Sequence, residues 1–401
     1  MATRRRAVYD PRARGHIAAV VLGAMLLVVH PAASGGARGL ARAHGPHARV
    51  GAVGWALTEP MRADHDGGTA TLLRDGRVLV TGGSSFVRPP LANAETYDPR
   101  TGRWVATGSL RDGRAGAAAV LLPDGRVLVA GGRLSDERGD RTAELYDPRS
   151  GRWSPTGPMA RAIRRSRTAA VLLRDGTALV VGGGGAQLYD PRSGRWTALV
   201  TRGLIWPNAV EAVALRDGRV LVVNGHGNGA APDAVVYDLR ARRWTATGTM
   251  PPGSSSYAEA LAPVGDGRVL AVGGFTDLRG NGPAGVAVYD SRTNRWVRGA
   301  SPRRRFEPLA TALPDGRVLL VGGATDIDDA HPVTTCDLYD GRTGRWTPTA
   351  ILHTPRVFAV GTLMTDGRYL VAGGTYEQQL LENADPSDLR GRAAEIFTPS
   401  P

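Results

Sequence analysis

Carboxylates stand near the start of three predicted strands, where they could hold a polar ligand or transfer a proton. Glu211, Glu259 and Glu307 precede consecutive Asp-Gly pairs by six to eight residues. Such groups can accept hydrogen bonds from sugar hydroxyls or serve as a general acid and base. Polar and aromatic residues from the same part of the chain could complete a site, namely Trp206, Asn208, His226 and Tyr257.

Basic residues recur ten positions before each Asp-Gly pair. In chain order, the residues at this position are His65, Arg114, Arg165, Pro207, Ser256, Arg305 and Arg356. Five of the seven are basic, so the side chains could ring a channel mouth and attract an anion. The alternative is a structural role in bonding between neighbouring repeats. The five basic residues, the three glutamates and the four polar and aromatic residues above together form the candidate ligand-binding residues, with no catalytic residue assigned.

The elements that would position these side chains follow from a repeat. Asp-Gly pairs begin at Asp75, Asp124, Asp175, Asp217, Asp266, Asp315 and Asp366, spaced by 42 to 51 residues. Apolar runs flank each pair, as in residues 117–122 and 126–130. Asp-Gly between apolar runs is a strong hairpin signal, and continuous apolar runs indicate strands buried on both faces.

Each repeat continues with a second pair of strands. Residues 143–146 read as a third strand, and Asp147-Pro-Arg-Ser-Gly151 is the turn into a fourth strand that carries Trp153. Asp and Pro initiate such turns, and Gly accepts the left-handed backbone. In the fourth repeat Arg242 replaces the turn glycine, which predicts a different turn. Four strands in about 50 residues form a sheet that must stack against others.

The two ends of the repeat region predict closure of a ring. The last repeat has a third strand at 394–397 and no Trp strand after it, whereas a Trp strand at 54–60 precedes the first repeat. Trp55 precedes Trp104 by one period, so the N-terminal strand completes the last blade. We expect an all-β, seven-bladed propeller over residues 44–401, with the strand around Trp55 closing the last blade.

The repeat resembles the kelch family, in its bacterial, galactose-oxidase-like branch. The residues that carry the resemblance are the Tyr-Asp pairs, the spaced Trp residues and the Gly-Gly pairs at 82–83, 131–132, 182–183, 273–274, 322–323 and 373–374. The fourth repeat departs, with Asn224-Gly225. The resemblance implies a kelch-type propeller over about residues 50–401.

Residues 1–43 read as an export signal. Arg4, Arg5 and Arg6 open a positive segment, and Ile17 to Val29 form an apolar run of 13 residues, too short to span a bilayer. Cleavage is expected after Ser34 or Ala43. We therefore expect a secreted, periplasmic or extracellular protein with no membrane insertion after cleavage.

Charge and cysteine content restrict the partners. Residues 44–401 carry a net charge of only +7, and their arginines alternate with acids in turns, so no nucleic-acid partner is expected. Cys336 is the only cysteine, which excludes an intrachain disulfide. Asp326, Asp328, Asp329 and His331 could bind calcium, but their spacing favours a solvated loop. No metal or other cofactor is expected.

Three functions fit these observations. The first is a non-catalytic, monomeric binding module whose variable loops, between second and third strands, recognise a glycan or protein. The second is a cofactor-free sugar mutarotase or epimerase that uses the glutamates and the basic ring. The third is a copper oxidase like galactose oxidase, because the hairpin at residues 122–132 resembles that family. The resemblance implies that such an enzyme would require two His ligands, two Tyr ligands and a Cys linked to one Tyr. The binding module is the interpretation favoured here.

Overall fold

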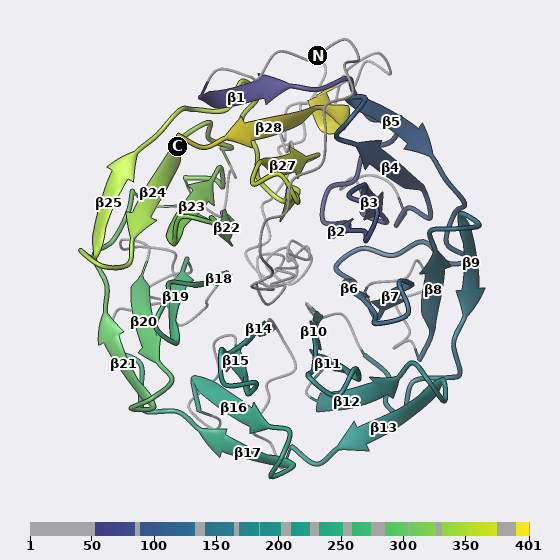
Figure 1. The fold of residues 1–401 in the computed structure, drawn as a ribbon, viewed down its shortest axis with the longest axis horizontal. Helices are drawn as coiled ribbons and strands as arrows, with labels where there is room; N and C mark the ends of the chain where they lie inside the picture. The colour runs from purple at the N-terminus through teal and green to yellow at the C-terminus, as the bar shows by residue number, and fades with distance from the viewer. Residues whose placement is uncertain are drawn as a thin grey trace, which may run out of the picture.

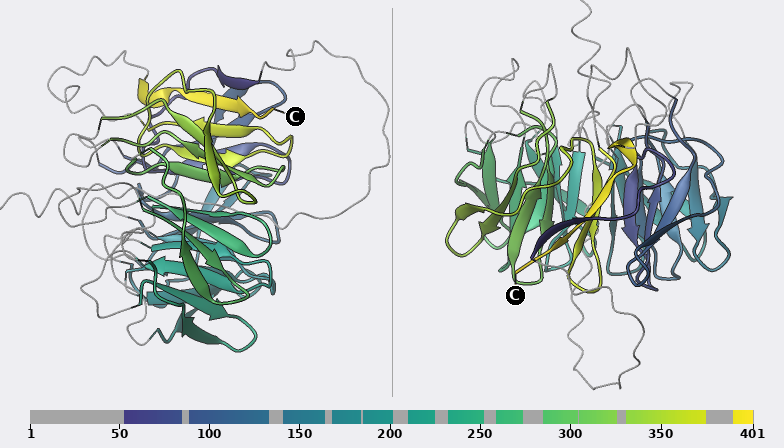
Figure 2. Two further views of the ribbon diagram at one scale, coloured as in Figure 1. Left: turned by 90° about the vertical axis from the view of Figure 1, so that its left-hand side faces the viewer. Right: turned by 90° about the horizontal axis from the view of Figure 1, so that it is seen from above.

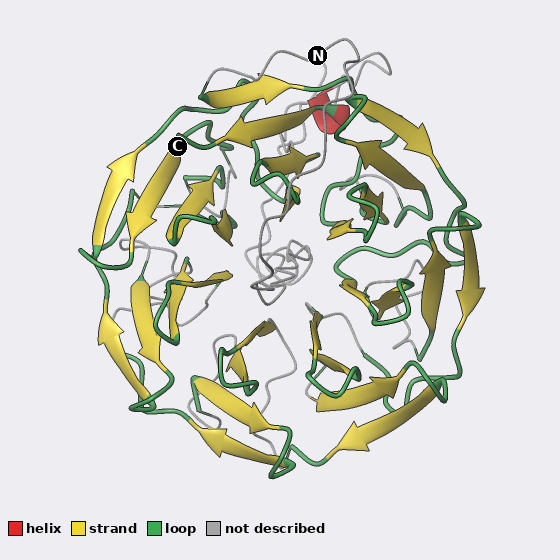
Figure 3. Ribbon diagram, viewed as in Figure 1, coloured by secondary structure: helices red, strands yellow, loops and turns green. Residues whose placement is uncertain are grey.

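The structure is a computed structural model that describes residues 53–84, 89–132, 141–163, 168–183, 185–201, 210–224, 232–251, 259–273, 285–303, 305–325, 331–374 and 390–400. Seven four-stranded antiparallel sheets stand around a central axis (Figure 1), which confirms the predicted seven-bladed propeller. The described part is almost entirely strand and turn (Figure 3), with one short 3₁₀ helix, η2 (Arg390–Arg392). The predicted export signal lies outside the described residues.

Each blade runs from an innermost to an outermost strand. Blade 1 holds β2 (Thr69–Leu72), β3 (Val78–Thr81), β4 (Ala94–Asp98) and β5 (Arg103–Ala106); blade 2 holds β6 (Ala118–Leu121), β7 (Val127–Ala130), β8 (Ala143–Asp147) and β9 (Arg152–Pro155); blade 3 holds β10 (Ala169–Leu172), β11 (Ala178–Gly182), β12 (Gly185–Asp190) and β13 (Arg195–Leu199). Blade 4 holds β14 (Val210–Ala214), β15 (Val220–Asn224), β16 (Ala234–Asp238) and β17 (Arg243–Ala246); blade 5 holds β18 (Ala260–Pro263), β19 (Arg268–Val272), β20 (Val286–Asp290) and β21 (Arg295–Arg298). Blade 6 holds β22 (Leu309–Ala312), β23 (Arg317–Val321), β24 (Cys336–Asp340) and β25 (Arg345–Pro348); blade 7 holds β26 (Val360–Leu363), β27 (Tyr369–Ala372), β28 (Ala394–Thr398) and β1 (Gly54–Leu57).

The turns form as the sequence predicts in the blades with a turn glycine, but the prediction of a different turn in blade 4 is wrong. In blade 2, Oδ1 of Asp124 accepts the N–H of Arg126 at 3.0 Å, and Oδ1 of Asp147 accepts the N–H of Arg149 at 2.9 Å. Gly151 takes the left-handed backbone at φ 68°. In blade 4 the corresponding Arg242 has φ 49°, so this turn keeps the left-handed backbone with a residue that disfavours it.

The hydrophobic core lies between the blades. Strand β7 is buried along its whole length, as its continuous apolar run predicts. Apolar clusters are shared by neighbouring sheets: one combines Val213 of blade 4 with Leu261 of blade 5, and another combines Val180 of blade 3 with Val129 of blade 2. Each sheet therefore depends on its neighbours to bury its two faces.

The first strand and the last strand close the ring. Strand β1 pairs antiparallel with β28, with Trp55 opposite Phe397, and the indole N–H of Trp55 donates to the carbonyl of Ala350 in blade 6 at 3.0 Å. The predicted closure of the last blade by the strand around Trp55 is confirmed.

The Gly-Gly pairs let neighbouring blades approach. Gly82 has φ 69°, and a Cβ on it would lie 2.5 Å from the carbonyl oxygen of Arg114 in blade 2. The N–H of Gly83 donates to that same oxygen at 2.7 Å. A side chain at position 82 would therefore separate blade 1 from blade 2.

Turns alternate between the two ends of the ring. We call the end with the Asp-Gly hairpins and the Tyr-Asp turns the turn face, and the opposite end the loop face. Figure 2 shows both ends from the side, with the C-terminus at the turn face. Within the described part of the chain, no helix has the length and apolar character needed to cross a membrane.

Candidate functional site

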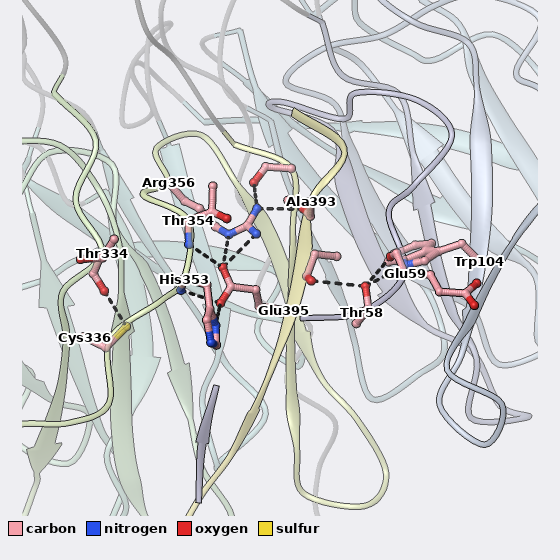
Figure 4. A network of polar contacts seen from close by, with 12 residues as sticks. Thr58, Glu59, Trp104, Thr334, Cys336, His353, Thr354, Arg356, Ala393 and Glu395 are labelled. Atoms are coloured by element: carbon pink, nitrogen blue, oxygen red, sulfur yellow. Dashed lines mark hydrogen bonds and ion pairs between the residues drawn. The ribbon is translucent and has the colours of Figure 1, made fainter. Parts of the chain in front are cut away.

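A buried ion pair joins the first and third strands of blade 7. Arg356 precedes β26, and its guanidinium donates from Nη2 to Oε1 of Glu395 on β28 at 3.1 Å (Figure 4). Its Nη1 donates to the carbonyls of Gly373 and Ala393 at 2.6 and 2.8 Å. The other oxygen of Glu395 accepts the backbone N–H of His353 at 2.8 Å. We call this arrangement the clamp.

Both charges of this clamp are almost inaccessible to solvent. Arg356 is 1% exposed and Glu395 is fully buried. Burial lowers the pKa of the Arg356 guanidinium, and the facing carboxylate of Glu395 opposes that shift. A charge held this way depends on its partner, because water cannot replace the lost interaction.

The clamp recurs in blades 1, 2 and 6. Nη2 of Arg114 lies 3.3 Å from Oε1 of Glu144, and Arg305 donates to Asp337. In blade 1, Nε2 of His65 lies 3.4 Å from Oε1 of Glu95, while its Nδ1 lies 2.7 Å from the carbonyl oxygen of Gly82. Each basic group therefore bonds within its own blade.

These contacts show what the predicted basic ring does. His65, Arg114, Arg305 and Arg356 are at most 2% exposed, so they form no open ring of cations at a channel mouth. The alternative of a structural role describes them better, with one correction. Their side chains bond inside the blade, and the contact between blades is made by backbone, as at Arg114. Arg165 lies outside the described residues.

The acidic partners follow a pattern that we did not identify in the sequence. Each stands two residues before the aromatic residue that is last but one in the third strand, as Glu144 does before Tyr146. Blade 3 has Gln187 there, and its amide exchanges hydrogen bonds with the backbone of Arg161 at 3.1 and 3.2 Å. An alignment of the third strands would have revealed this position.

Blades 4 and 5 lack both members of the clamp. Their third strands carry Val235 and Ala287 at the acidic position, and both residues are buried. The basic position holds Pro207 and Ser256. Base and acid are therefore both absent from these two blades, which avoids burying either charge alone. Blade 3 differs, because it keeps the base, Arg165, and has Gln187 in place of the acid.

The three predicted glutamates lie in this unclamped sector and at its border. Glu211 is 6% exposed, on β14 beside the residues that pack against blade 5. Glu259 directly precedes β18 and is 2% exposed. Glu307, in blade 6, is 5% exposed. All three are at the loop-face end of innermost strands, which is the end where the sequence placed a site.

Glu259 and Glu307 are in direct contact across the boundary between blades 5 and 6. Oε2 of Glu259 accepts the backbone N–H of Glu307 at 2.7 Å. Glu307 has φ 50°, a left-handed conformation that glycine adopts at the equivalent positions of blades 1 and 2, Gly67 and Gly116. There, the N–H of Gly116 donates to the carbonyl of Gly67 at 2.9 Å. A carboxylate thus replaces a backbone carbonyl at this boundary, and it fixes a strained residue.

The other predicted features are the polar and aromatic candidates, the acidic loop and Cys336. Trp206, Asn208, His226 and Tyr257 lie outside the described residues, as do Asp326, Asp328 and Asp329. Among the described residues, no three His, Cys, Asp or Glu side chains lie together so as to hold a metal ion. Cys336 is buried on β24, and this burial raises the pKa of its thiol to about 11. The thiol is therefore protonated at neutral pH and a poor nucleophile.

Comparison with known proteins agrees with this architecture. Residues 68–111, 114–160 and 257–303 match the Kelch motif. Together with the seven four-stranded blades, these matches place the chain in the kelch-repeat β-propeller family. No curated protein sequence matches the chain.

One similar solved structure is a fungal alcohol oxidase of the AA5 family in complex with copper. Its TM-score is 0.66 at 19% sequence identity, and the alignment covers 87% of this chain and 77% of that chain. At this identity the similarity shows a shared fold alone.

Proposed function

We propose that this protein is an exported kelch propeller that binds a polar ligand, a glycan or a glycan-bearing protein, at the loop face over blades 4 to 6. The observation that supports this is the concentration of buried carboxylates in and beside the sector without the clamp: Glu211 in blade 4, Glu259 in blade 5 and Glu307 in the adjoining blade 6. Carboxylates held at a rigid strand end suit recognition of sugar hydroxyls. The N-terminal basic and apolar segments support export.

A thermal-shift and calorimetric screen of neutral sugars, acidic sugars and cell-wall fragments tests this proposal. A specific ligand raises the melting temperature through mass action. Glu259→Gln should weaken binding at least tenfold, because an amide lacks the charge that strengthens a hydrogen bond to a hydroxyl. Glu59→Gln, on an exposed segment, is the matched control and should bind normally. Equal binding by both variants would remove Glu259 from the site.

A cofactor-free sugar isomerase is the second candidate. The contact between Glu259 and the backbone of Glu307 brings two carboxylate-bearing residues together, and mutarotation or epimerisation needs a positioned acid and base. Turnover of a bound sugar, followed by polarimetry or NMR and lost in Glu307→Gln, would favour the enzyme over the binding module. The similarity to a copper-bound oxidase is one of fold, and we propose no copper chemistry for this chain.

A further inference from the structure

An arginine bridge connects neighbouring blades on the turn face. In blade 1, Nε of Arg77 pairs with Oδ2 of its hairpin Asp75 at 2.9 Å, and Nη2 donates to the carbonyl of Pro148 in blade 2 at 3.2 Å. The same arginine position reaches the next blade at five further boundaries: Arg126 to Pro191, Arg219 to Ser291, Arg268 to Gly341, Arg317 to Ser400 and Arg368 to Pro99.

Blade 3 has no such bridge. Thr177 occupies the arginine position, and its hydroxyl bonds back to Oδ1 of its own Asp175 at 2.7 Å. A threonine side chain is too short to span the distance that arginine covers elsewhere. Among the seven boundaries on the described turn face, only that between blades 3 and 4 therefore lacks a bridge from this arginine position. A different hairpin arginine, Arg174 of blade 3, donates there to the carbonyl of Arg216 in blade 4, as Arg74 donates to the carbonyl of Pro123 between blades 1 and 2.

A tryptophan bond also connects the outer strands. The indole N–H of each outer Trp donates to the segment that leaves the preceding blade, at 2.6 to 3.2 Å: Trp55 to Ala350, Trp104 to Thr58, Trp153 to Gly108, Trp196 to Thr156, Trp296 to Thr247 and Trp346 to Ala300. Trp244 of blade 4 is the exception. Its indole N–H is buried without a hydrogen-bond partner, again at the boundary with blade 3.

The outer Trp residues use two kinds of acceptor, either a threonine hydroxyl or a backbone carbonyl: Thr58, Thr156 and Thr247, or Gly108, Ala300 and Ala350. The boundary between blades 3 and 4 lacks the first kind. The hydroxyl of Thr107, at the end of blade 1, shares a hydrogen bond of 2.8 Å with the hydroxyl of Tyr146 in blade 2. The backbone N–H of Thr107 donates to the carbonyl of Ala94. In blade 3 the residue opposite the equivalent Ala186 is Leu199, which has no hydroxyl. Correspondingly, the hydroxyl of Tyr237 in blade 4 is buried without a partner.

We propose that the boundary between blades 3 and 4 is the seam at which the ring opens. It lacks the bridge from the common arginine position and the tryptophan bond that the six other boundaries have, and it keeps the bond from Arg174 to Arg216 in their place. It also leaves two buried donors unpaired, each of which is costly. An apolar cluster that includes Leu179 and Val222 still holds the two blades together. Regions with few lateral bonds open at a lower free energy than the rest of a fold. Opening here would move β14, and with it Glu211.

Hydrogen exchange of the full chain, followed by mass spectrometry, tests the seam. We expect outer strands β13 and β17, which flank it, to exchange faster than β21 and β25, which flank the intact boundary between blades 5 and 6. Thr177→Arg should restore the bridge and slow exchange of β13 and β17 about fivefold, the effect of about one hydrogen bond on an opening equilibrium.

Two further variants keep the test decisive. Leu199→Thr restores an acceptor for Trp244 and Tyr237 and should slow the same strands even if an arginine at 177 is poorly accommodated. Arg268→Thr removes an intact bridge and should speed exchange of β21 and β25 while leaving β13 and β17 unchanged. The proposal is overturned if β1 and β28 open before β13 and β17, or if neither restoring variant slows the seam.

Discussion

Blade 7 and blade 4 solve the same packing problem in opposite ways. In blade 7, Arg356 and Glu395 fill the space between the first and third strands with a buried ion pair. In blade 4, Val235 stands at the acidic position and Pro207 at the basic one. A buried pair and a well-packed apolar replacement can be similarly stable, but a single buried charge cannot. The comparison teaches that blade 7 keeps both charges and blade 4 neither, so that neither blade buries a single charge.

Breaking the clamp on one side should have the largest effect. Glu395→Ala leaves Arg356 buried without its counter-ion and the N–H of His353 without its acceptor. We expect a loss of about 3–5 kcal/mol in the free energy of unfolding, measured by urea denaturation. A loss below about 1 kcal/mol would mean that the clamp does not carry the difference between the blades.

Converting a clamped blade into an unclamped one should cost less. Arg114→Met combined with Glu144→Leu removes both charges from blade 2, although the carbonyls of Gly131 and Thr142 lose their donor. The double variant should lose about 1–3 kcal/mol, less than Glu144→Leu alone. A double-mutant cycle in urea measures this, and simple additivity of the two single losses would contradict the paired interpretation.

Lowering the pH should decrease the stability of the clamped blades. Burial alone would raise the pKa of Glu95, but bonds from His65 and from the N–H groups of Arg62 and Ala63 outweigh it and lower the pKa below 4.5. The contribution of the Glu95 carboxylate to the free energy of unfolding is therefore complete above pH 4.5. It is lost as the pH falls through the lower pKa of the folded state. Stability measured from pH 6 to 2 should fall less steeply in Glu95→Gln than in the unchanged protein.

The smallest effect is expected in the unclamped sector. Glu259→Gln keeps an oxygen that can accept the N–H of Glu307, and no clamp arginine stands in blade 5. The free energy of unfolding should change by less than about 1 kcal/mol, in contrast to Glu395→Ala. Thermal and urea unfolding of both variants side by side make the comparison. A large loss in Glu259→Gln would assign its carboxylate to stability and weaken its proposed role in binding.

The repeat made the fold predictable. Asp-Gly hairpins and spaced Trp residues recur seven times and Tyr-Asp turns six times, so an error in interpreting one repeat is corrected by the others. Even the closure of blade 7 by Trp55 followed from a missing strand at one end and a surplus strand at the other.

The roles of the candidate residues were less accessible. The basic position was identified from its spacing, but its partner stands about 30 residues away, as Arg114 and Glu144 do. Spacing along one strand says nothing about which blade a side chain faces. The seam depends on two separate departures, at Thr177 and Leu199, and on the unpaired indole of Trp244, which only become related when the blades are adjacent in space.

The pairing of β1 with β28 has a consequence for how the protein is made. Its partners are about 340 residues apart, so the first strand to be synthesised must wait for the last before it can be paired. Until β28 has been made, β1 has no partner and β27 presents an unpaired edge, which is a template for association with other chains. A chain that is cut short or stalled before residue 394 would leave Trp55 and its strand unpaired. The ring thus becomes resistant to aggregation only when synthesis is complete.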